Sequence, residues 1–285
     1  MHAFAMARPK VVFVLGATAT GKSKLAIALS KRFDGEVINA DKIQVYAGLP
    51  VITNKVTDAE RAGVPHHLLG VIRDPGADYA PEHFRRDAAA AVAGVLSAGR
   101  LPVVAGGSNG YVEALVKGAA FRRAHDALFL WLDAEPRLLE WHASARVDDM
   151  VRAGAVAEAR AAFHAGDGDY TRGVRRAIGL AEMHGYQRLL AAAEGATDAE
   201  LAGALARALQ DMKDNTARLA RAQSEKLRRL SRLDGWDVRR VDVTPVLLRM
   251  ADGEAFRDST WEKVVWEPCE EMVRRFLGND PTPRP

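Results

Sequence analysis

The stretch GATATGKS, residues 16–23, decides the fold of this 285-residue chain. It matches GxxxxGK[ST], follows the apolar run 11–15 and leads into a helical pattern that begins at Lys24. A strand, a glycine loop and a helix in that order form the context in which this motif binds phosphate. The glycines let backbone N–H groups converge on phosphate oxygens, and the helix N-terminus adds partial positive charge. The sequence therefore predicts a site for a polyphosphate compound, with Lys22 at the phosphate oxygens and the Ser23 hydroxyl on Mg²⁺.

The bulk composition fits a globular protein with a sizeable core. Apolar residues make up 48% of the chain, yet no stretch approaches the ~20 apolar residues that a membrane span needs, so we expect no membrane partner. Cys269 is the only cysteine, which excludes an internal disulfide framework and a cysteine-based zinc site. The net charge of +3 suits an anionic small substrate or RNA and decides neither.

The segment ahead of the first predicted strand bears on localisation. Residues 1–10 are too few for a secretory signal or a long transit peptide. We expect a cytoplasmic protein, or a plastid protein if a longer native leader is missing.

Further strands are predicted at 36–41, 101–105, 127–133 and 237–243. Helical patterns lie between them, and such alternation indicates an α/β fold, a P-loop NTPase-like parallel sheet flanked by helices. The helical patterns are clearest at 82–98 and 109–117.

Three polar segments follow the carboxyl ends of predicted strands. They are the phosphate-binding loop 16–23, Asp41 and the segment 106–109. Ligands bind beyond these strand ends in parallel sheets, so we expect the three segments to meet at one edge.

The domain organisation follows from a change in character near residue 135. An α/β core at 10–134 gives way to an Ala/Arg/Leu-rich inserted helical subdomain at 135–234. A strand and helix at 235–278 return to the core, and we expect the tail 279–285 to be disordered. Thr197 has capping-box spacing to a glutamate three residues on, and opens a long helix.

Several blocks of sequence resemble the adenine isopentenyltransferases. The blocks are DKIQVY at 41–46, TNK at 53–55, VPHHLL at 64–69, GGSNGY at 106–111, SARVDDM at 144–150, YTRGVRRAIG at 170–179 and KDNT at 213–216. They run in the family's order across about three quarters of the chain, counted from the phosphate-binding loop. The paired histidines of the third block lie on an extended segment, where adjacent side chains point apart, so we expect no metal pair there.

Two branches share this family core, the tRNA dimethylallyltransferases and the plant adenylate isopentenyltransferases. The sequence of these blocks resembles the plant branch more closely, because the tRNA branch usually has Gly-Gly-Thr-Gly where this chain has GGSN at 106–109. One departure lies in the late helix, where the family usually carries Leu-Ala-x-Arg-Gln. This chain has LARAQ at 219–223, so Ala222 takes the arginine position and Arg221 precedes it.

The resemblance implies transfer of a dimethylallyl group from dimethylallyl diphosphate to the N6 amino group of ATP, ADP or AMP, the first step of cytokinin biosynthesis. Mg²⁺ is the implied cofactor, held through Ser23, and we expect a monomer that binds no nucleic acid. The implied ligands of the donor diphosphate are the loop residues and one helical arginine: Gly16, Thr18, Thr20, Gly21, Lys22, Ser23 and Arg146.

The implied catalytic residues are Asp41, Ser108, Lys22 and Arg146. Asp41 would accept the proton of the adenine amino group as the C–N bond forms; alternatively, a strand-terminal aspartate holds Mg²⁺ or caps a loop. Ser108 would hydrogen-bond the bridging oxygen of the donor, or serve as a helix N-cap, and both roles can hold at once.

The implied acceptor-binding residues are Asp41, Asn54, Lys55, Arg175, Arg176 and Lys213. For a single helical arginine or lysine, the alternative is a solvated helix face.

Three other functions stay open at this stage. They are prenylation of A37 in tRNA, phosphoryl transfer by a P-loop kinase, and non-catalytic nucleotide binding.

Overall fold

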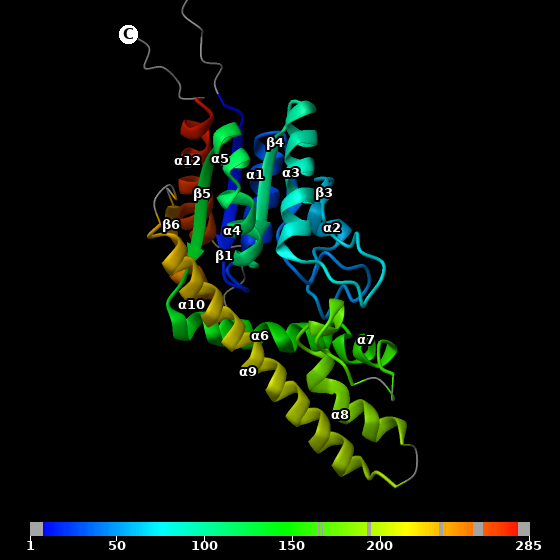
Figure 1. The fold of residues 1–285 in the computed structure, drawn as a ribbon. Helices are drawn as coiled ribbons and strands as arrows, with labels where there is room; N and C mark the ends of the chain where they lie inside the picture. Colours follow the sequence, from blue (N-terminus) through cyan, green and yellow to red (C-terminus); the bar gives the residue numbers. More distant parts are fainter. Residues whose placement is uncertain are drawn as a thin grey trace, which may run out of the picture.

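The computed structural model describes residues 8–164, 166, 168–192, 195–233, 236, 238–252 and 259–278, and Figure 1 traces the chain. The expected disordered tail at 279–285 and the first residue of the expected strand at 237 lie outside the described residues. No helix of the described part is long and apolar enough to cross a membrane.

The sheet confirms the predicted α/β architecture. Its strands in the described residues are β1 (Lys10–Gly16), β2 (Gly35–Asn39), β3 (His66–His67), β4 (Leu101–Gly106), β5 (Asp126–Asp133) and β6 (Val238–Asp242). The order across the sheet is β3-β2-β4-β1-β5-β6, and every pairing is parallel. The predicted strands all form, and β3 is an addition, a two-residue edge strand on the segment expected to be merely extended.

Helices cover both faces of this sheet. The α-helices are α1 (Lys22–Arg32), α2 (Asp58–Arg61), α3 (Pro81–Ser97), α4 (Asn109–Lys117), α5 (Ala119–Ala124), α6 (Pro136–Arg152), α7 (Ala155–Ala161), α8 (Leu180–Ala191), α9 (Asp198–Leu230), α10 (Thr244–Ala251), α11 (Ser259–Trp261) and α12 (Glu267–Leu277). A short 3₁₀ helix, η1 (Gly173–Arg176), and a π-helical turn, η2 (Glu262–Trp266), complete the helical elements.

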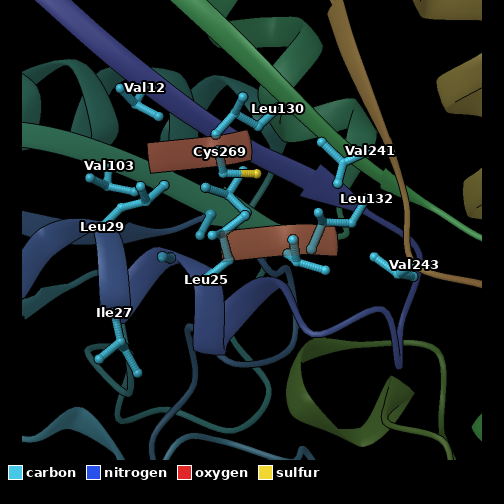
Figure 2. Packing of buried hydrophobic residues seen from close by; sticks show 14 of the residues in the cluster. Val12, Leu25, Ile27, Leu29, Val103, Leu130, Leu132, Val241, Val243 and Cys269 are labelled. Atoms are coloured by element: carbon cyan, nitrogen blue, oxygen red, sulfur yellow. The ribbon is translucent and has the colours of Figure 1, made fainter. Parts of the chain in front are cut away.

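Alternate residues of the central strand β1 enter two separate cores, as the two-residue period of a strand requires. Val12 and Val14 pack with α1 and α12, a cluster in which Cys269 is fully buried (Figure 2). Val11 and Phe13 point to the other face, toward α3, α4 and α5.

In the sequence, helices α6 to α9 lie between β5 and β6, two strands that are neighbours in the sheet. They share a third core that includes Val147, Leu180 and Met212. The predicted capping box is present at the start of α9, where Thr197 and Glu200 satisfy each other's backbone N–H groups. In Figure 1, α8 and the first half of α9 project away from the sheet, and α9 then returns to it.

A buried aromatic stack joins the sheet to the segment that follows α9. The Phe129 ring lies 4.7 Å from that of Phe13 and 4.8 Å from that of Trp236, measured between centroids. We expect Phe129→Ala to lower the free energy of unfolding by about 3–5 kcal/mol, because it loses the buried ring and leaves a cavity. Urea denaturation would measure this loss. Leu248→Ala, at a half-exposed position of α10, is the control and should change stability by less than about 0.5 kcal/mol.

Candidate active site

A cavity of about 440 Å³ opens at the carboxyl ends of β1, β2 and β4. Residues 18–23, Asp41 and the glycines 106 and 107 all line it, so the predicted meeting of three segments at one edge is confirmed. Helices α6 and α9, the 3₁₀ helix η1 and helix α10 supply the remaining walls. The sheet and the inserted helices therefore both contribute to the site.

The phosphate-binding loop is shaped by close backbone approaches. A Cβ on Gly16 would lie 2.8 Å from the Leu132 carbonyl oxygen of the neighbouring strand, so no larger residue fits. Gly21 precedes the first residue of α1 with φ 85°, a left-handed conformation that glycine adopts without strain. The Thr20 hydroxyl is buried and donates to the Ala17 carbonyl at 2.9 Å, which closes the loop on itself.

Lys22 folds over this loop and donates to the Ala17 carbonyl at 2.5 Å. Burial, and to a smaller extent the positive charge of Arg146, lower the pKa of Lys22 to about 7, against a smaller opposing effect of Asp41. Arg146 extends from α6 and donates to the Thr18 hydroxyl at 3.3 Å. Burial lowers the pKa of Arg146 as well. Two half-buried basic side chains therefore lie beside the loop, an arrangement that favours an anionic ligand.

Asp41 lies just beyond β2, where its Oδ1 accepts hydrogen bonds from the amides of Ile43 at 2.9 Å and Gln44 at 3.2 Å. The loop-capping role left open by the sequence is therefore present. One carboxylate oxygen is fixed by backbone donors, and the residue lines the cavity. This arrangement leaves the second oxygen, Oδ2, as the acceptor available to a ligand.

Ser108 ties the segment after β4 to the segment that carries Asp41. Its Oγ accepts from the Lys42 amide at 2.8 Å, and its own amide donates to the Ala40 carbonyl at 3.2 Å. Ser108 occupies the N-cap position of α4, but its side chain makes no capping hydrogen bond. Gly106 passes so close to the Ala40 backbone that a Cβ there would overlap it.

Two of the predicted acceptor residues, Asn54 and Arg176, line the cavity beside Asp41. Arg176 comes from η1 and also donates to the Gly173 carbonyl at 3.3 Å.

The other three predicted acceptor residues are absent from the cavity lining. Lys55 donates to the Gly48 carbonyl at 2.8 Å, and burial lowers its pKa to about 8. Lys213 pairs with Asp148 of α6 at 2.7 Å. Arg175 lines a separate, smaller cavity.

The cavity residues that the sequence interpretation did not assign to the site include His142, Gln223 and Trp261. His142 lies one helical turn before Arg146, and burial together with the Arg146 charge lowers its pKa to about 4, so the imidazole is neutral at physiological pH. The sequence signal that could have identified His142 is its i, i+4 spacing from Arg146, which places both side chains on one face of the helix. Gln223 of α9 belongs to the late-helix block, and its side-chain oxygen accepts a hydrogen bond from the Thr18 amide of the phosphate-binding loop. Trp261 lies against Lys24, with the ammonium 3.9 Å from the ring centroid.

Apolar side chains form part of the cavity lining, the apolar wall. They are Ile52, Ala143, Met150, Ile178, Met212, Leu219, Val243, Val246 and Leu247. A cavity lined by both cations and apolar side chains suits an anion with an apolar tail.

Comparison with known proteins places this geometry in context. The profile of the family described as IPP transferase matches residues 44–127 and 119–230. The adenylate isopentenyltransferase 5, chloroplastic, of Arabidopsis thaliana is 44% identical over 95% of this chain and 81% of its own length. The adenylate isopentenyltransferase 7, mitochondrial, of the same plant is 41% identical over 98% of this chain and 84% of its own. The adenylate isopentenyltransferase of Humulus lupulus is 36% identical over 93% and 89%.

Solved structures share the fold. A eukaryotic dimethylallyltransferase acting on tRNA superimposes with a TM-score of 0.77 at 24% identity, over 97% of this chain and 81% of its own. The tRNA isopentenylpyrophosphate transferase of Bacillus halodurans gives 0.69 at 24% identity, over 95% and 99%.

The lowered pKa of Lys22 predicts proton uptake when inorganic diphosphate binds. At pH 8 the free amine is mostly neutral, and an adjacent anion favours the ammonium form, so binding should draw a proton and weaken as pH rises above about 7. Titration calorimetry in buffers of different ionisation enthalpy would measure the uptake. Lys22→Arg, whose charge does not titrate in this range, is the control, and equal proton uptake by both proteins would contradict the prediction.

Proposed function

The chain belongs to the IPP transferase family, among its adenylate isopentenyltransferases, and from this premise we propose that it transfers the dimethylallyl group of dimethylallyl diphosphate to N6 of ATP, ADP or AMP. This reaction is the first step of cytokinin biosynthesis. The supporting observation is the cavity itself, whose lining combines one carboxylate, Asp41, with the apolar wall. Its cations are Lys22, Lys24, Lys42, Arg146 and Arg176.

The donor's diphosphate would bind the phosphate-binding loop, with Lys22 and Arg146 at its oxygens and the dimethylallyl tail against the apolar wall. Negative charge grows on the leaving diphosphate as its bond to C1 breaks. Cations and backbone amides aimed at that charge stabilise the transition state more than the ground state. Burial lowers the pKa of both side chains despite nearby carboxylates, so a bound diphosphate would also offset their desolvation.

Mg²⁺ fits the donor set around Ser23. The described residues hold no cluster of three histidine, cysteine, aspartate or glutamate side chains, so an all-protein cage is not built here. Mg²⁺ is usually bound through one or two protein oxygens together with substrate phosphates and waters. Ser23, exposed on the first turn of α1 and part of the cavity lining, would supply the protein oxygen. The ion would neutralise charge on the diphosphate.

Asp41 would act as the general base. The N6 lone pair is delocalised into the adenine ring, so the amine is a poor nucleophile until a carboxylate hydrogen-bonds its N–H and accepts the proton. Since Oδ1 is fixed by two backbone amides, we assign Oδ2 to the amine. The C1–N6 bond forms, the C1–O bond breaks, and the proton passes to Asp41.

Arg176, from the cavity lining, and Ser108, which follows the lining residue Gly107 but is outside the lining itself, would complete the site. The Ser108 Oγ accepts from the Lys42 amide, which leaves its hydroxyl proton to donate to the bridging oxygen of the donor. Arg176, which lines the cavity beside Asn54, would hold the acceptor's phosphates. Lys55, Arg175 and Lys213 lie outside that lining, so Arg176 carries this role alone among the predicted basic residues.

The function is tested by offering acceptors separately. AMP, ADP, ATP and an anticodon stem-loop containing A37 would each be incubated with dimethylallyl diphosphate and Mg²⁺, and the added C5 unit read by mass. We expect free nucleotides to be prenylated, with ATP and ADP preferred to AMP. Prenylation of the RNA alone would overturn the proposal in favour of the tRNA activity, and release of ADP from ATP without a donor would indicate a kinase.

The base role predicts a selective defect for Asp41→Asn. The amide keeps an oxygen for the Ile43 and Gln44 amides but cannot accept a proton, so kcat should fall by about 10²–10⁴-fold with nucleotide binding retained. Steady-state kinetics and nucleotide titration would measure both quantities. Asp74→Asn is the matched control, because Asp74 caps an exposed turn in the same way through the Gly76 amide. Near-normal turnover of Asp41→Asn would remove Asp41 from the base role.

A further inference from the structure

Gln223 bridges two loops that are far apart in the sequence. Its Oε1 accepts from the Thr18 amide at 2.7 Å, and its Nε2 donates to the Gly107 carbonyl at 3.0 Å. Its backbone carbonyl also accepts from the Asn109 side chain at 2.9 Å, which fixes the base of the side chain. Gln223 of α9 thus makes hydrogen bonds to the phosphate-binding loop, to the segment after β4 and to the start of α4.

The bridge is a close-packed contact. A Cβ on Gly107 would lie 2.6 Å from the Gln223 Nε2, so the glycine leaves the space that the amide fills. An amide group is also the side-chain terminus that can accept from one loop and donate to the other in the same plane. A carboxylate of the same shape could keep only the first of these bonds.

The bridge continues to Asp41 through Ser108. Ser108 follows Gly107 directly and makes hydrogen bonds on either side of Asp41. Its Oγ accepts from the Lys42 amide, and its own amide donates to the Ala40 carbonyl. Gln223 therefore connects the loop that would hold the leaving diphosphate with the segment that would hold the base.

We propose that Gln223 is a positioning residue that sets the separation between the donor's diphosphate and the acceptor's amine. This inference rests on the proposed function. Displacement at C1 needs the attacking nitrogen and the leaving oxygen in line, and a misplacement of about 1 Å can cost about 10²-fold in rate. Gln223 touches neither reacting atom in this scheme, and acts through the two loops that do.

The test begins with the ligand-free chain. Residue-resolved amide hydrogen exchange would compare the wild type with Gln223→Leu, which loses both side-chain bonds, and Gln223→Glu, which keeps the acceptor for Thr18. We expect faster exchange in 17–23 and in 106–109 for the leucine variant, and in 106–109 alone for the glutamate variant. Gln210→Leu, at an exposed glutamine of the same helix that bonds Asp214, should change neither segment. Unchanged exchange of both segments in Gln223→Leu would overturn the proposal.

Kinetics then separate alignment from binding. With dimethylallyl diphosphate and ADP at saturation, we expect kcat of Gln223→Leu to fall by about 10²-fold while the KM for ADP stays near that of the wild type. Gln210→Leu should match the wild type. A Gln223→Leu enzyme with unchanged kcat and a lower KM for the donor would overturn the proposal, because Gln223 would then merely compete with diphosphate for the Thr18 amide. A wild-type chain that prenylates no nucleotide would refute the proposed function instead, and the exchange experiment would still decide whether Gln223 couples the loops.

Discussion

The close approach of the strand ends to one another is the constraint on which the site depends. β1 lies between β4 and β5, and the loop after β1 passes the Leu132 carbonyl of β5 at a distance that only Gly16 allows. Gly106 meets the Ala40 backbone in the same way at the end of β4. Because both contacts are backbone to backbone, the positions of Asp41 and the phosphate-binding loop are set by the sheet rather than by flexible side chains. The inserted helices then complete a cavity whose floor is already fixed.

The electrostatics of the cavity depend on the basic side chains that α1 and the inserted helix α6 place beside the phosphate-binding loop. Arg146 and Lys22 are both half-buried beside the loop, and the Arg146 charge adds to the effect of burial in lowering the pKa of Lys22. Withdrawing cations from water is costly, and a ligand that supplies negative charge offsets that cost. His142, in the same environment, is held neutral and adds no further charge. The cavity is thus matched to a diphosphate more closely than to a neutral metabolite.

The sequence predicted the central strands β1, β4 and β5 well because they are apolar runs closed by glycine or aspartate, the pattern that strands buried on both faces demand. It predicted the meeting of Asp41 with the phosphate-binding loop because parallel strands present their carboxyl ends at one edge. It could not rank Arg175 against Arg176, since the orientation of adjacent side chains depends on the 3₁₀ turn of η1. Nor could it find the pairing of Lys213 with Asp148, which exists only once α9 packs on α6.

The late-helix block shows how a one-residue difference is absorbed. Met212, Leu219 and Gln223 form the cavity face of α9, and Arg221 lies about 200° around the helix from Gln223. It turns away to pair with Glu140 of α6 at 2.7 Å. Ala222, where the family usually has arginine, supplies no charge, so no cation from α9 is part of the described lining. The cavity's positive charge comes instead from α1, α6, η1 and the segment after β2. Under the proposed function, α9 would contribute alignment through Gln223, and the other walls would bind the anion.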